Sequence, residues 1–449
     1  MPVLSAIEAI RPIESKADLI AHLALGAHTA PSRGVGAEME KLMIDIETGE
    51  AADFDRIEQL LLQLETSGSW EGVRENGRLI GLLGDKSSIT LEPGGQMELS
   101  GALCPDIHCS NIDYVDYVAQ ITPAAKQLGL AFLGLGTQPF SKLDQIAWLP
   151  KNRYGIMSRY MLKTGERGQQ MMKQTAGLQV NFDFRDEADC IALLRLSMQL
   201  SPLLYALFAN SPLLGGEPTG FLSTRGEIWR QTDPDRTGLI PALFKDGAGF
   251  ETYVDYALNI PMYFLVRNGK YIDLTGSRFT FAQFLSEGHN GETAILGDWD
   301  LHLSTLFPEV RLRPQVEVRT ADALPSSMSL SVAALLKGLF YDDVARKETE
   351  KLLRTQDLQT VYPLSWRLGL KTPCGSATLL EPARELLKIA RDSLKRQGRT
   401  RNNCDETIYL EGLDEIVETG VTLAERLLSR WHGSHREKIE ALLSHSEIG

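Results

Sequence analysis

The chain has 449 residues, 43% of them hydrophobic, and a formal net charge of −13. This length allows two or three domains or one large enzyme domain, with ample apolar material for a core. The acidic balance argues against binding nucleic acid through a basic surface.

No run of about 18 uncharged apolar residues predicts a membrane span. Charged residues between Glu8 and Asp18 interrupt any signal-peptide core. The five cysteines are widely spread and form no C-x-x-C pair, so neither a zinc site nor a disulfide framework is expected. We therefore expect a cytoplasmic protein that has no nucleic-acid or membrane partner.

Hydrophobic periodicity predicts a mixed α+β order along the chain. Helices are expected at 4–26, 54–66, 112–129 and 186–209, strands at 35–45, 177–184 and 310–319, and mainly helical segments at 328–353 and 376–432. Pro314 lacks a ladder donor and predicts an edge or bulge in its strand. No repeat or linker is visible, so we predict one domain over 1–449, with a sheet-bearing core at about 12–325 and a helical part at about 328–432.

Several predicted strands carry an acidic or amide face. Glu38 and Glu40 share one face of their strand, with carboxylates about 7 Å apart. A single strand of this kind is more often half-exposed than functional. The recurrence favours one polar cavity built on a sheet, to which two later strands contribute Gln179 with Asn181 and Glu317 with Arg319.

A hairpin-like segment, TLEPGGQMELSGA at 90–102, places Glu92 and Glu98 on either side of a Pro-Gly-Gly turn. Two acids on adjacent strand ends suit Mg²⁺, which prefers oxygen ligands. A solvated hairpin with acidic edges explains the segment equally well. Together with Glu38, Glu40 and Glu317, these acids could hold two or three Mg²⁺ ions.

The segment FLSTRGEIWRQTDPDRTG at 221–238 is rich in charge. Arg225, Asp233 and Arg236 suit an amino-acid zwitterion, because guanidinium groups bind carboxylates and carboxylates bind ammonium groups. The alternative is a plain turn at Asp-Pro-Asp-Arg-Thr-Gly. Arg319 is the best candidate to stabilise a transferring phosphoryl group. The chain has no Walker loop, no G-x-G-x-x-G and no G-x-S-x-G.

Long stretches of the chain resemble glutamate–cysteine ligase of the plant and proteobacterial type, from about residue 12 to 432. They include GAEMEKLMID at 36–45, SITLEPGGQMELSGA at 88–102, LPKNRYGIMSRYM at 149–161, LQVNFDF at 178–184, LFANSPL at 207–213, FLSTRGEIWRQTDPDRTG at 221–238, YVDYALNIPMYF at 253–264, FPEVRLRPQVEVRTAD at 307–322 and GLKTP at 369–373.

The resemblance implies a curved antiparallel sheet funnel of the glutamine synthetase and guanidino-kinase type, covered by helices. It also implies ATP-dependent phosphorylation of the γ-carboxylate of glutamate, followed by attack of the cysteine amine, as the first step of glutathione synthesis. The residues that match the family's Mg²⁺–ATP acids are Glu38, Glu40, Glu92, Glu98 and Glu317. Gln179 and Asn181 match a strand near the metals, Arg225 the residue that holds glutamate, and Arg319 the phosphate-facing arginine.

Three features of the sequence depart from the family pattern. Met39 replaces a histidine and Leu42 a phenylalanine, and residues 323–328 read Ala-Leu-Pro-Ser-Ser-Met where the family has Gly-Gly-Pro-Trp-Arg-Arg. Loss of a tryptophan and two arginines beside Arg319 is not conservative. It keeps open a ligase with a different amino acid or amine substrate, in a specialised pathway. A non-catalytic paralogue is a third reading, which retention of all five acids disfavours.

Overall fold

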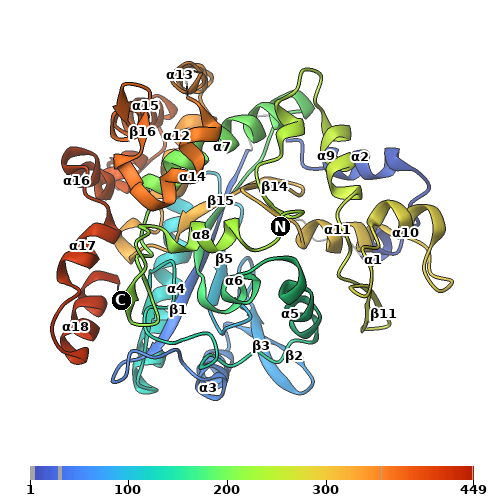
Figure 1. Ribbon diagram of the computed structural model, residues 1–449, viewed down its shortest axis with the longest axis horizontal. Coiled ribbons are helices and arrows are strands. Elements are labelled where there is room, and N and C mark those ends of the chain that lie inside the picture. The colour runs from blue at the N-terminus through green and yellow to red at the C-terminus, as the bar shows by residue number, and fades with distance from the viewer. Residues whose placement is uncertain (1–5, 29–32, 355, 447, 449) are drawn as a thin grey trace.

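The centre of the protein is one antiparallel sheet (Figure 1). The computed structural model describes residues 6–28, 33–354, 356–446 and 448, and within them the sheet has nine strands. Their order is β14-β15-β7-β1-β5-β4-β3-β2, with β6 also paired to β1. The strands are β1 (Val35–Asp45), β2 (Glu71–Glu75), β3 (Arg78–Leu83), β4 (Ser88–Leu91), β5 (Met97–Ser100), β6 (Leu130–Leu133), β7 (Gly177–Phe182), β14 (Val310–Leu312) and β15 (Val316–Asp322).

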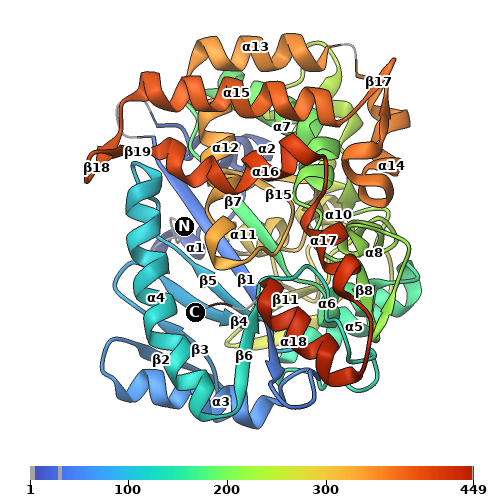
Figure 2. The same cartoon turned by 90° about the vertical axis from the view of Figure 1, so that its left-hand side faces the viewer.

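Helices from distant parts of the chain cover this sheet. The helices α4, α7 and α12 contact β1, β6, β7 and β15, and the C-terminal helices lie outside them (Figure 2). The helices are α1 (Ala6–Ala9), α2 (Lys16–Ala24), α3 (Phe54–Thr66), α4 (Ile107–Gln127), α5 (Asn152–Thr164), α6 (Gly168–Gln174), α7 (Glu187–Leu207), α8 (Thr224–Arg230), α9 (Phe250–Leu258), α10 (Phe281–Glu287), α11 (Leu296–Ser304), α12 (Ser331–Phe340), α13 (Asp343–Leu353), α14 (Leu358–Leu368), α15 (Leu380–Gln397), α16 (Glu411–Thr419), α17 (Leu423–Arg430) and α18 (His435–Ser446).

Short two-stranded ribbons and 3₁₀ turns complete the structure. The ribbons pair β8 (Leu213–Leu214) with β9 (Glu217–Pro218), β10 (Thr237–Gly238) with β13 (Phe307–Pro308), β11 (Phe264–Arg267) with β12 (Lys270–Asp273), β16 (Pro373–Cys374) with β17 (Ala377–Thr378), and β18 (Thr400–Arg401) with β19 (Cys404–Asp405). The 3₁₀ turns are η1 (Pro241–Phe244), η2 (Ser326–Met328), η3 (Gly369–Lys371) and η4 (Glu406–Leu410).

The long central strand β1 fixes which side of the sheet is polar. Ala37 and Met39 are buried in the hydrophobic core, whereas Glu38 and Glu40 point to the opposite face, as strand alternation requires. The predicted strand at 35–45 and the predicted helix at 54–66 are confirmed at their bounds. Met39 therefore lies behind the polar face and does not disturb it.

Two predicted elements are divided in the structure. The helix expected at 4–26 is α1 and α2, because Pro12 bridges to Ile295 and Ser15 starts a new helix, its amide donating to Asp18 at 3.0 Å; residues 4 and 5 lie outside the described residues. The strand expected at 310–319 is a hairpin of β14 and β15, folded at Pro314, which has no amide hydrogen to extend a ladder.

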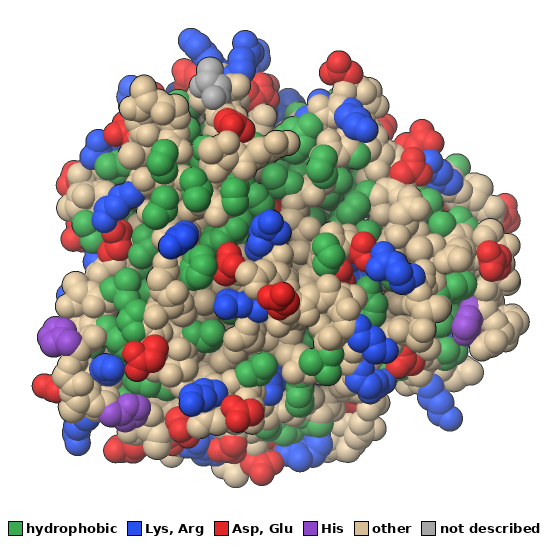
Figure 3. All heavy atoms as spheres, in the orientation of Figure 1, with side chains coloured by type: hydrophobic (Ala, Val, Ile, Leu, Met, Phe, Trp, Pro, Cys, Tyr) green, Lys and Arg blue, Asp and Glu red, His purple; other side chains and the backbone are tan. Residues whose placement is uncertain are grey.

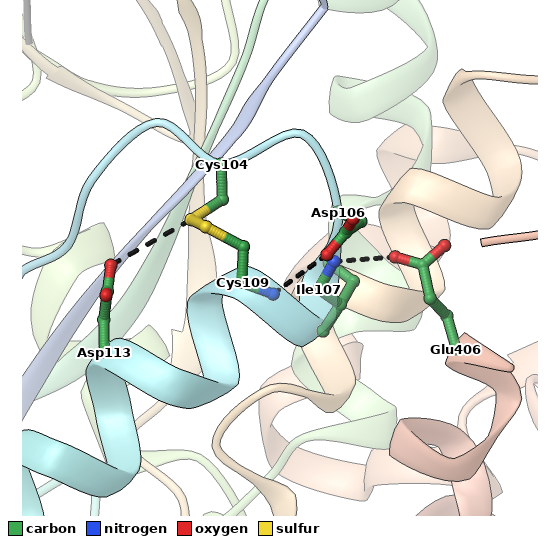
Figure 4. The surroundings of a disulfide bond; sticks show 6 residues. All are labelled: Cys104, Asp106, Ile107, Cys109, Asp113 and Glu406. Atoms are coloured by element: carbon green, nitrogen blue, oxygen red, sulfur yellow. Dashed lines mark hydrogen bonds between the residues drawn. A yellow bond between two sulfur atoms is a disulfide. The ribbon is translucent and has the colours of Figure 1, made fainter. Parts of the chain in front are cut away.

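No disulfide framework was expected from the cysteine spacing, yet the structure contains one disulfide bond. Cys104 and Cys109 are joined, with their Cα atoms 5.7 Å apart (Figure 4). The bond closes the turn that leads into α4, where Asp106 accepts the Cys109 amide at 2.9 Å and Glu406 accepts the Ile107 amide at 2.7 Å. A five-residue spacing lies outside the C-x-x-C pattern, so only the fold brings these thiols together.

One of the described helices, α7, has the length and apolar composition of a membrane-crossing segment. Its apolar window is 83% buried inside the protein, where it contacts β15 and α14. Core helices of this kind pass the same test of length and composition.

Candidate active site

A cavity of about 1050 Å³ lies against the polar face of the sheet. On the surface viewed in Figure 3, acidic and basic side chains are interspersed, and a mixed group lies near the centre of that face. Strands β1, β4, β5, β7 and β15 each contribute to the cavity lining. The predicted site residues that line it are Glu38, Glu40, Glu92, Glu98, Gln179, Asn181 and Arg319.

The register of the sheet places two acids of this cavity directly opposite each other. Glu40 on β1 and Glu98 on β5 are direct cross-strand partners, an arrangement that is unfavourable for like charges. Glu98 is only 9% exposed. Burial and the nearby carboxylates raise the pKa of Glu40 to about 7 and that of Glu98 well above its usual value. Burial and Glu317 likewise raise the pKa of Glu38.

Neutral donors hold these carboxylates in place. Glu40 accepts hydrogen bonds from the Gly177 amide at 2.6 Å and from Gln179 Nε2 at 2.9 Å. Glu38 accepts one from Asn181 Nδ2 at 3.0 Å. The predicted amide residues therefore sit beside the acids on β7, and their placement orients the carboxylates without cancelling their charge.

The donor set fits hard cations. Among the described residues, neither Glu38, Glu40 nor Glu98 forms an ion pair with Lys, Arg or His within 4.0 Å. Buried carboxylates in one cavity without a cation are costly, and an all-oxygen set matches the preference of Mg²⁺. In the part of the chain that the structure describes, Cys104, Cys109 and Asp113 form the one group of three potential ligands within 4.8 Å of one another, so the glutamates stand wider apart than that.

Glu317 lies between two arginines. Arg311 donates to it bidentately, with both contacts at 2.8 Å, and Arg319 Nη1 also donates to it. Burial alone would raise the pKa of Glu317, but the charges of Arg311 and Arg319 outweigh it and lower this pKa to about 2. Arg319 also contacts Gln179, so this group fixes a guanidinium on the cavity wall.

Arg225 lies behind the cavity wall and is not among its lining residues. Its guanidinium donates to the backbone carbonyls of Arg319 at 2.9 Å and Thr320 at 3.3 Å. The guanidinium groups of Arg225 and Arg319 both lie near the ring of Trp229, which lines the cavity, at 5.8 and 5.7 Å from its centroid. In this structure the Arg225 guanidinium holds the backbone of β15.

Asp233 and Arg236 also lie outside the cavity lining. Both are fully buried, with Arg236 Nε 3.0 Å from Asp233 Oδ2. The Arg236 guanidinium stacks on Tyr263, 3.8 Å from the ring centroid, and its Nη2 donates to the Pro261 carbonyl. The predicted zwitterion-binding residues Arg225, Asp233 and Arg236 are therefore buried. Trp229 of the same segment lines the cavity.

Sequence reasoning missed several cationic residues of the cavity. Lys151 and Arg153 begin α5, and Arg311 and Arg313 lie on the β14 side of the hairpin. In the sequence, Arg311 and Arg313 share one face of the predicted strand at 310–319 with Glu317 and Arg319. This alternation was the signal that could have identified them. Lys151 and Arg153 have no periodic signal, because they lie where a loop meets a helix.

The altered turn at 323–328 lies outside the cavity lining. Leu324 O and Ser329 Oγ accept hydrogen bonds from the buried Lys41 at 2.6 and 3.0 Å, on the opposite face of β1 from the acids. Ser326 Oγ lies 3.1 Å from the Tyr114 hydroxyl of α4. The turn therefore packs against the helical layer, and its sequence does not shape this cavity.

The comparisons with known proteins agree on one family. A family profile described as glutamate-cysteine ligase family 2 matches residues 34–445. The chain belongs to this family. It is 41% identical over 448 residues to the chloroplastic glutamate–cysteine ligase of Arabidopsis thaliana, covering 98% of this chain and 84% of the relative. With the Medicago truncatula enzyme, also chloroplastic, it shares 40% identity over 451 residues, covering 98% and 86%.

A solved structure supports the fold of this family member. The crystal structure of glutamate–cysteine ligase from Francisella tularensis in complex with AMP aligns with a TM-score of 0.54 at 14% identity, covering 92% of this chain and 88% of the other. The predicted fold class is thereby confirmed. The expected cytoplasmic location is contradicted, because the plant relatives named above are chloroplastic proteins. That expectation rested on the charged residues near the N-terminus, the missing apolar run and the cysteine spacing, none of which records a compartment.

Proposed function

We propose that this ligase joins the γ-carboxylate of L-glutamate to the amine of L-cysteine at the expense of ATP, the first step of glutathione synthesis. The observation that carries the proposal is the pair of opposed, unneutralised carboxylates Glu40 and Glu98 in the cavity. A protein tolerates such a pair where a cation is bound. The naming of the relatives as glutamate–cysteine ligases supports the choice of substrates.

The chemistry requires activation of a poor electrophile. A carboxylate oxygen of glutamate attacks the γ-phosphorus of ATP, ADP leaves, and an acyl phosphate forms. The cysteine amine then attacks the acyl carbon, loses a proton, and expels phosphate that keeps the oxygen donated by glutamate. Both steps depend mainly on positioning and charge stabilisation.

The chain's own residues supply these two effects. We propose Glu38, Glu40 and Glu98 as the principal Mg²⁺ ligands, with Glu92 and Glu317 at the ends of the acidic row. Bound Mg²⁺ would neutralise the phosphates and these acids together. Gln179 and Asn181 orient the carboxylates, and Arg319, held by Glu317, faces the charge that develops on the transferring phosphoryl group.

Two of the sequence-predicted roles take a different form in this proposal. We propose that Arg225 acts as a positioning residue for β15, since its guanidinium holds the Arg319 and Thr320 carbonyls. We propose that Asp233 and Arg236 stabilise the adjoining wall, because both are fully buried among Tyr160 and Tyr263.

We propose that the chain works as a single catalytic domain. One cluster of buried hydrophobic residues extends from Ile13 to Ile448, through both the sheet-bearing and the helical parts. The proposed partners are ATP, glutamate and cysteine, with the protein as a monomer or homodimer. The turn at 323–328, which had favoured another substrate, lies away from the cavity and gives no support to that alternative.

The test is phosphate release by the purified protein with Mg²⁺, ATP and glutamate across a panel of amine acceptors. The proposal predicts release that depends on cysteine, together with stoichiometric γ-glutamylcysteine. Release with another acceptor alone would assign a different ligase. No release with any acceptor, from a folded protein that binds ATP, would overturn catalysis.

A further inference from the structure

A compact group of three potential metal ligands lies outside the cavity, at the start of α4. The sulfur atoms of Cys104 and Cys109 and a carboxylate oxygen of Asp113 lie within 4.8 Å of one another. None of these residues is among those that line the cavity. The proposed ligation uses none of them, so its chemistry does not account for their grouping.

The carboxylate of Asp113 is directed at the sulfur atoms. Its Oδ2 lies 4.0 Å from Cys104 Sγ, and Figure 4 shows it pointing toward that sulfur from the turn of α4 that follows Cys109. In the described part of the chain, Asp113 forms no ion pair with Lys, Arg or His within 4.0 Å. A sulfur atom in a disulfide carries no proton and donates nothing to a carboxylate. A thiol has a weak S–H donor, and a metal ion attracts thiolates and a carboxylate together.

The backbone holds the two cysteines in place without help from the sulfur–sulfur bond. Cys104 exchanges two hydrogen bonds with Val35 at the start of β1, N to O at 2.9 Å and O to N at 2.7 Å. Cys109 lies in the first turn of α4, where Asp106 accepts its amide at 2.9 Å. Asp113 follows Cys109 by four residues on the same helix and so shares its face. The three side chains therefore stay neighbours when the disulfide is reduced.

This spacing fits a tetrahedral metal ion. Zn–S bonds of about 2.3 Å place two thiolate sulfurs about 3.8 Å apart in a tetrahedral site. The Cα atoms of Cys104 and Cys109 are 5.7 Å apart, so rotation of the two side chains reaches that separation while the backbone stays in place. Two thiolates and a carboxylate suit Zn²⁺, which accepts both sulfur and oxygen, whereas Mg²⁺ prefers oxygen ligands alone.

The group is accessible from one side. Cys104 is buried, whereas Cys109 and Asp113 are half-buried. An ion can therefore enter past Cys109 and Asp113. Among the described residues no fourth His, Cys, Asp or Glu belongs to the group, so a water molecule completes the tetrahedron on the exposed side.

We propose that the reduced protein binds one Zn²⁺ ion through Cys104, Cys109 and Asp113, with water as the fourth ligand. A dithiol reductant supplies the two electrons and two protons that convert the disulfide to two thiols, and is itself oxidised to a disulfide. Zn²⁺ then forms two thiolate bonds, and both thiol protons pass to solvent. This site goes beyond the proposed ligation and does not depend on it.

The test uses Co²⁺ as a spectroscopic substitute for Zn²⁺, because thiolates bound to Co²⁺ give a charge-transfer band that carboxylates do not give. The protein is reduced with a phosphine, freed of it under nitrogen, and titrated in excess Mg²⁺, which occupies the carboxylates of the cavity. The samples are reduced and oxidised wild type, Cys109→Ser and Asp113→Asn. The matched controls are Cys404→Ser, at an exposed free cysteine, and Asp116→Asn, at an exposed acid of α4.

The expected result is a band that depends on reduction and on the named ligands. Reduced wild type should bind one Co²⁺ per chain with the charge-transfer band, and one equivalent of Zn²⁺ should abolish the band. Zn²⁺ binding to the metal-free, reduced protein should release about two protons. Oxidised wild type and Cys109→Ser should lack the band. Asp113→Asn should keep the thiolate band and weaken Zn²⁺ affinity about tenfold or more, and both controls should match the wild type.

Four outcomes would overturn the inference. They are no band in the reduced wild type, an equal band in the oxidised wild type, a band that survives in Cys109→Ser but is lost in Cys404→Ser, and unchanged Zn²⁺ affinity in Asp113→Asn. If Cys109→Ser does not fold, the comparison of reduced with oxidised wild type and the affinity of Asp113→Asn decide. The readouts are metal binding and proton release, so failure of the proposed ligation would leave this result unaffected.

Discussion

Glu40 and Glu98 face each other across β1 and β5 as register partners in the cavity, and no lysine or arginine of the described chain pairs with either. Thr90 and Ser100 donate to Glu98 at 3.2 and 2.9 Å, so its carboxylate is held by neutral groups. Without a metal, repulsion between these two buried carboxylates destabilises the fold, and a bound cation would remove that repulsion.

Neutralising one of these acids should separate stability from activity. Glu98→Gln is expected to raise the urea midpoint of the metal-free protein, because it removes a buried like-charge contact. It should also lower kcat/KM by about 100-fold or more, since a metal ligand is lost. The matched control is Glu71→Gln on the exposed edge strand β2, which should change neither. A loss of both stability and activity in Glu98→Gln would indicate a structural role.

Mg²⁺ binding should depend on pH. The pKa of Glu40 is raised to about 7 and that of Glu98 well above its usual value, so protons compete with the metal more strongly at pH 6 than at pH 8. Affinity for Mg²⁺, measured by calorimetry, should therefore increase from pH 6 to pH 8, with proton release that is greater at the lower pH. Equal affinity at both values, without proton release, would contradict this site.

The raised pKa of Glu40 should also make the folding stability of the metal-free protein depend on pH. A carboxyl group whose pKa is raised in the fold stabilises it below the unfolded value of 4.5 and loses that contribution as pH rises through about 7. The buried His302 and His445, with pKa lowered to about 3 and 4, act in the opposite sense. The difference between wild type and Glu40→Gln isolates Glu40, and the variant should gain relative stability between pH 5 and pH 7.5. No gain over this range would argue against the raised pKa.

A substitution of Arg225 distinguishes support of strand β15 from direct contact with glutamate. If it supports β15 through the Arg319 and Thr320 carbonyls, then Arg225→Met should lower kcat about tenfold or more while the KM for glutamate stays within about twofold. The alternative from the sequence, a direct contact with glutamate, predicts a raised KM with kcat largely kept. Initial rates over a range of glutamate concentrations distinguish the two.

The polar face of the sheet could be predicted from the sequence because alternation in β1 and β7 is a local property. Glu38, Glu40, Gln179 and Asn181 lie where that alternation places them. The packing of Arg225 and Arg236 could not be predicted in this way. A guanidinium near an apolar run looks the same whether it faces a substrate or a backbone carbonyl, and only tertiary packing distinguishes them.

The disulfide and the turn at 323–328 also depend on tertiary packing, which is why the sequence did not predict them. Cys104 and Cys109 become neighbours because the chain bends into α4, and residues 323–328 turn away from the cavity because Lys41 and Tyr114 hold them against the helical layer. Neither arrangement follows from residue spacing. Arg153 was likewise missed, because nothing in its local sequence shows that its Nε would be buried without a partner.

The disulfide should contribute to stability through its short loop. For a loop of about six residues, chain entropy predicts about 2 kcal/mol. Cys109→Ser should therefore lower the free energy of unfolding by that amount and abolish its response to a reductant. Cys404→Ser, at an exposed free cysteine, should keep the wild-type response. Five reactive thiols in the unreduced, denatured wild type would show that the bond does not form.

The most direct test of the central claim follows one oxygen atom. Glutamate labelled with ¹⁸O in its γ-carboxylate is incubated with the protein, Mg²⁺, ATP and cysteine, and the phosphate is examined by mass spectrometry. Activation through γ-glutamyl phosphate predicts ADP, and one ¹⁸O in the phosphate for each γ-glutamylcysteine formed. Unlabelled phosphate, or AMP with pyrophosphate as the products, would contradict it.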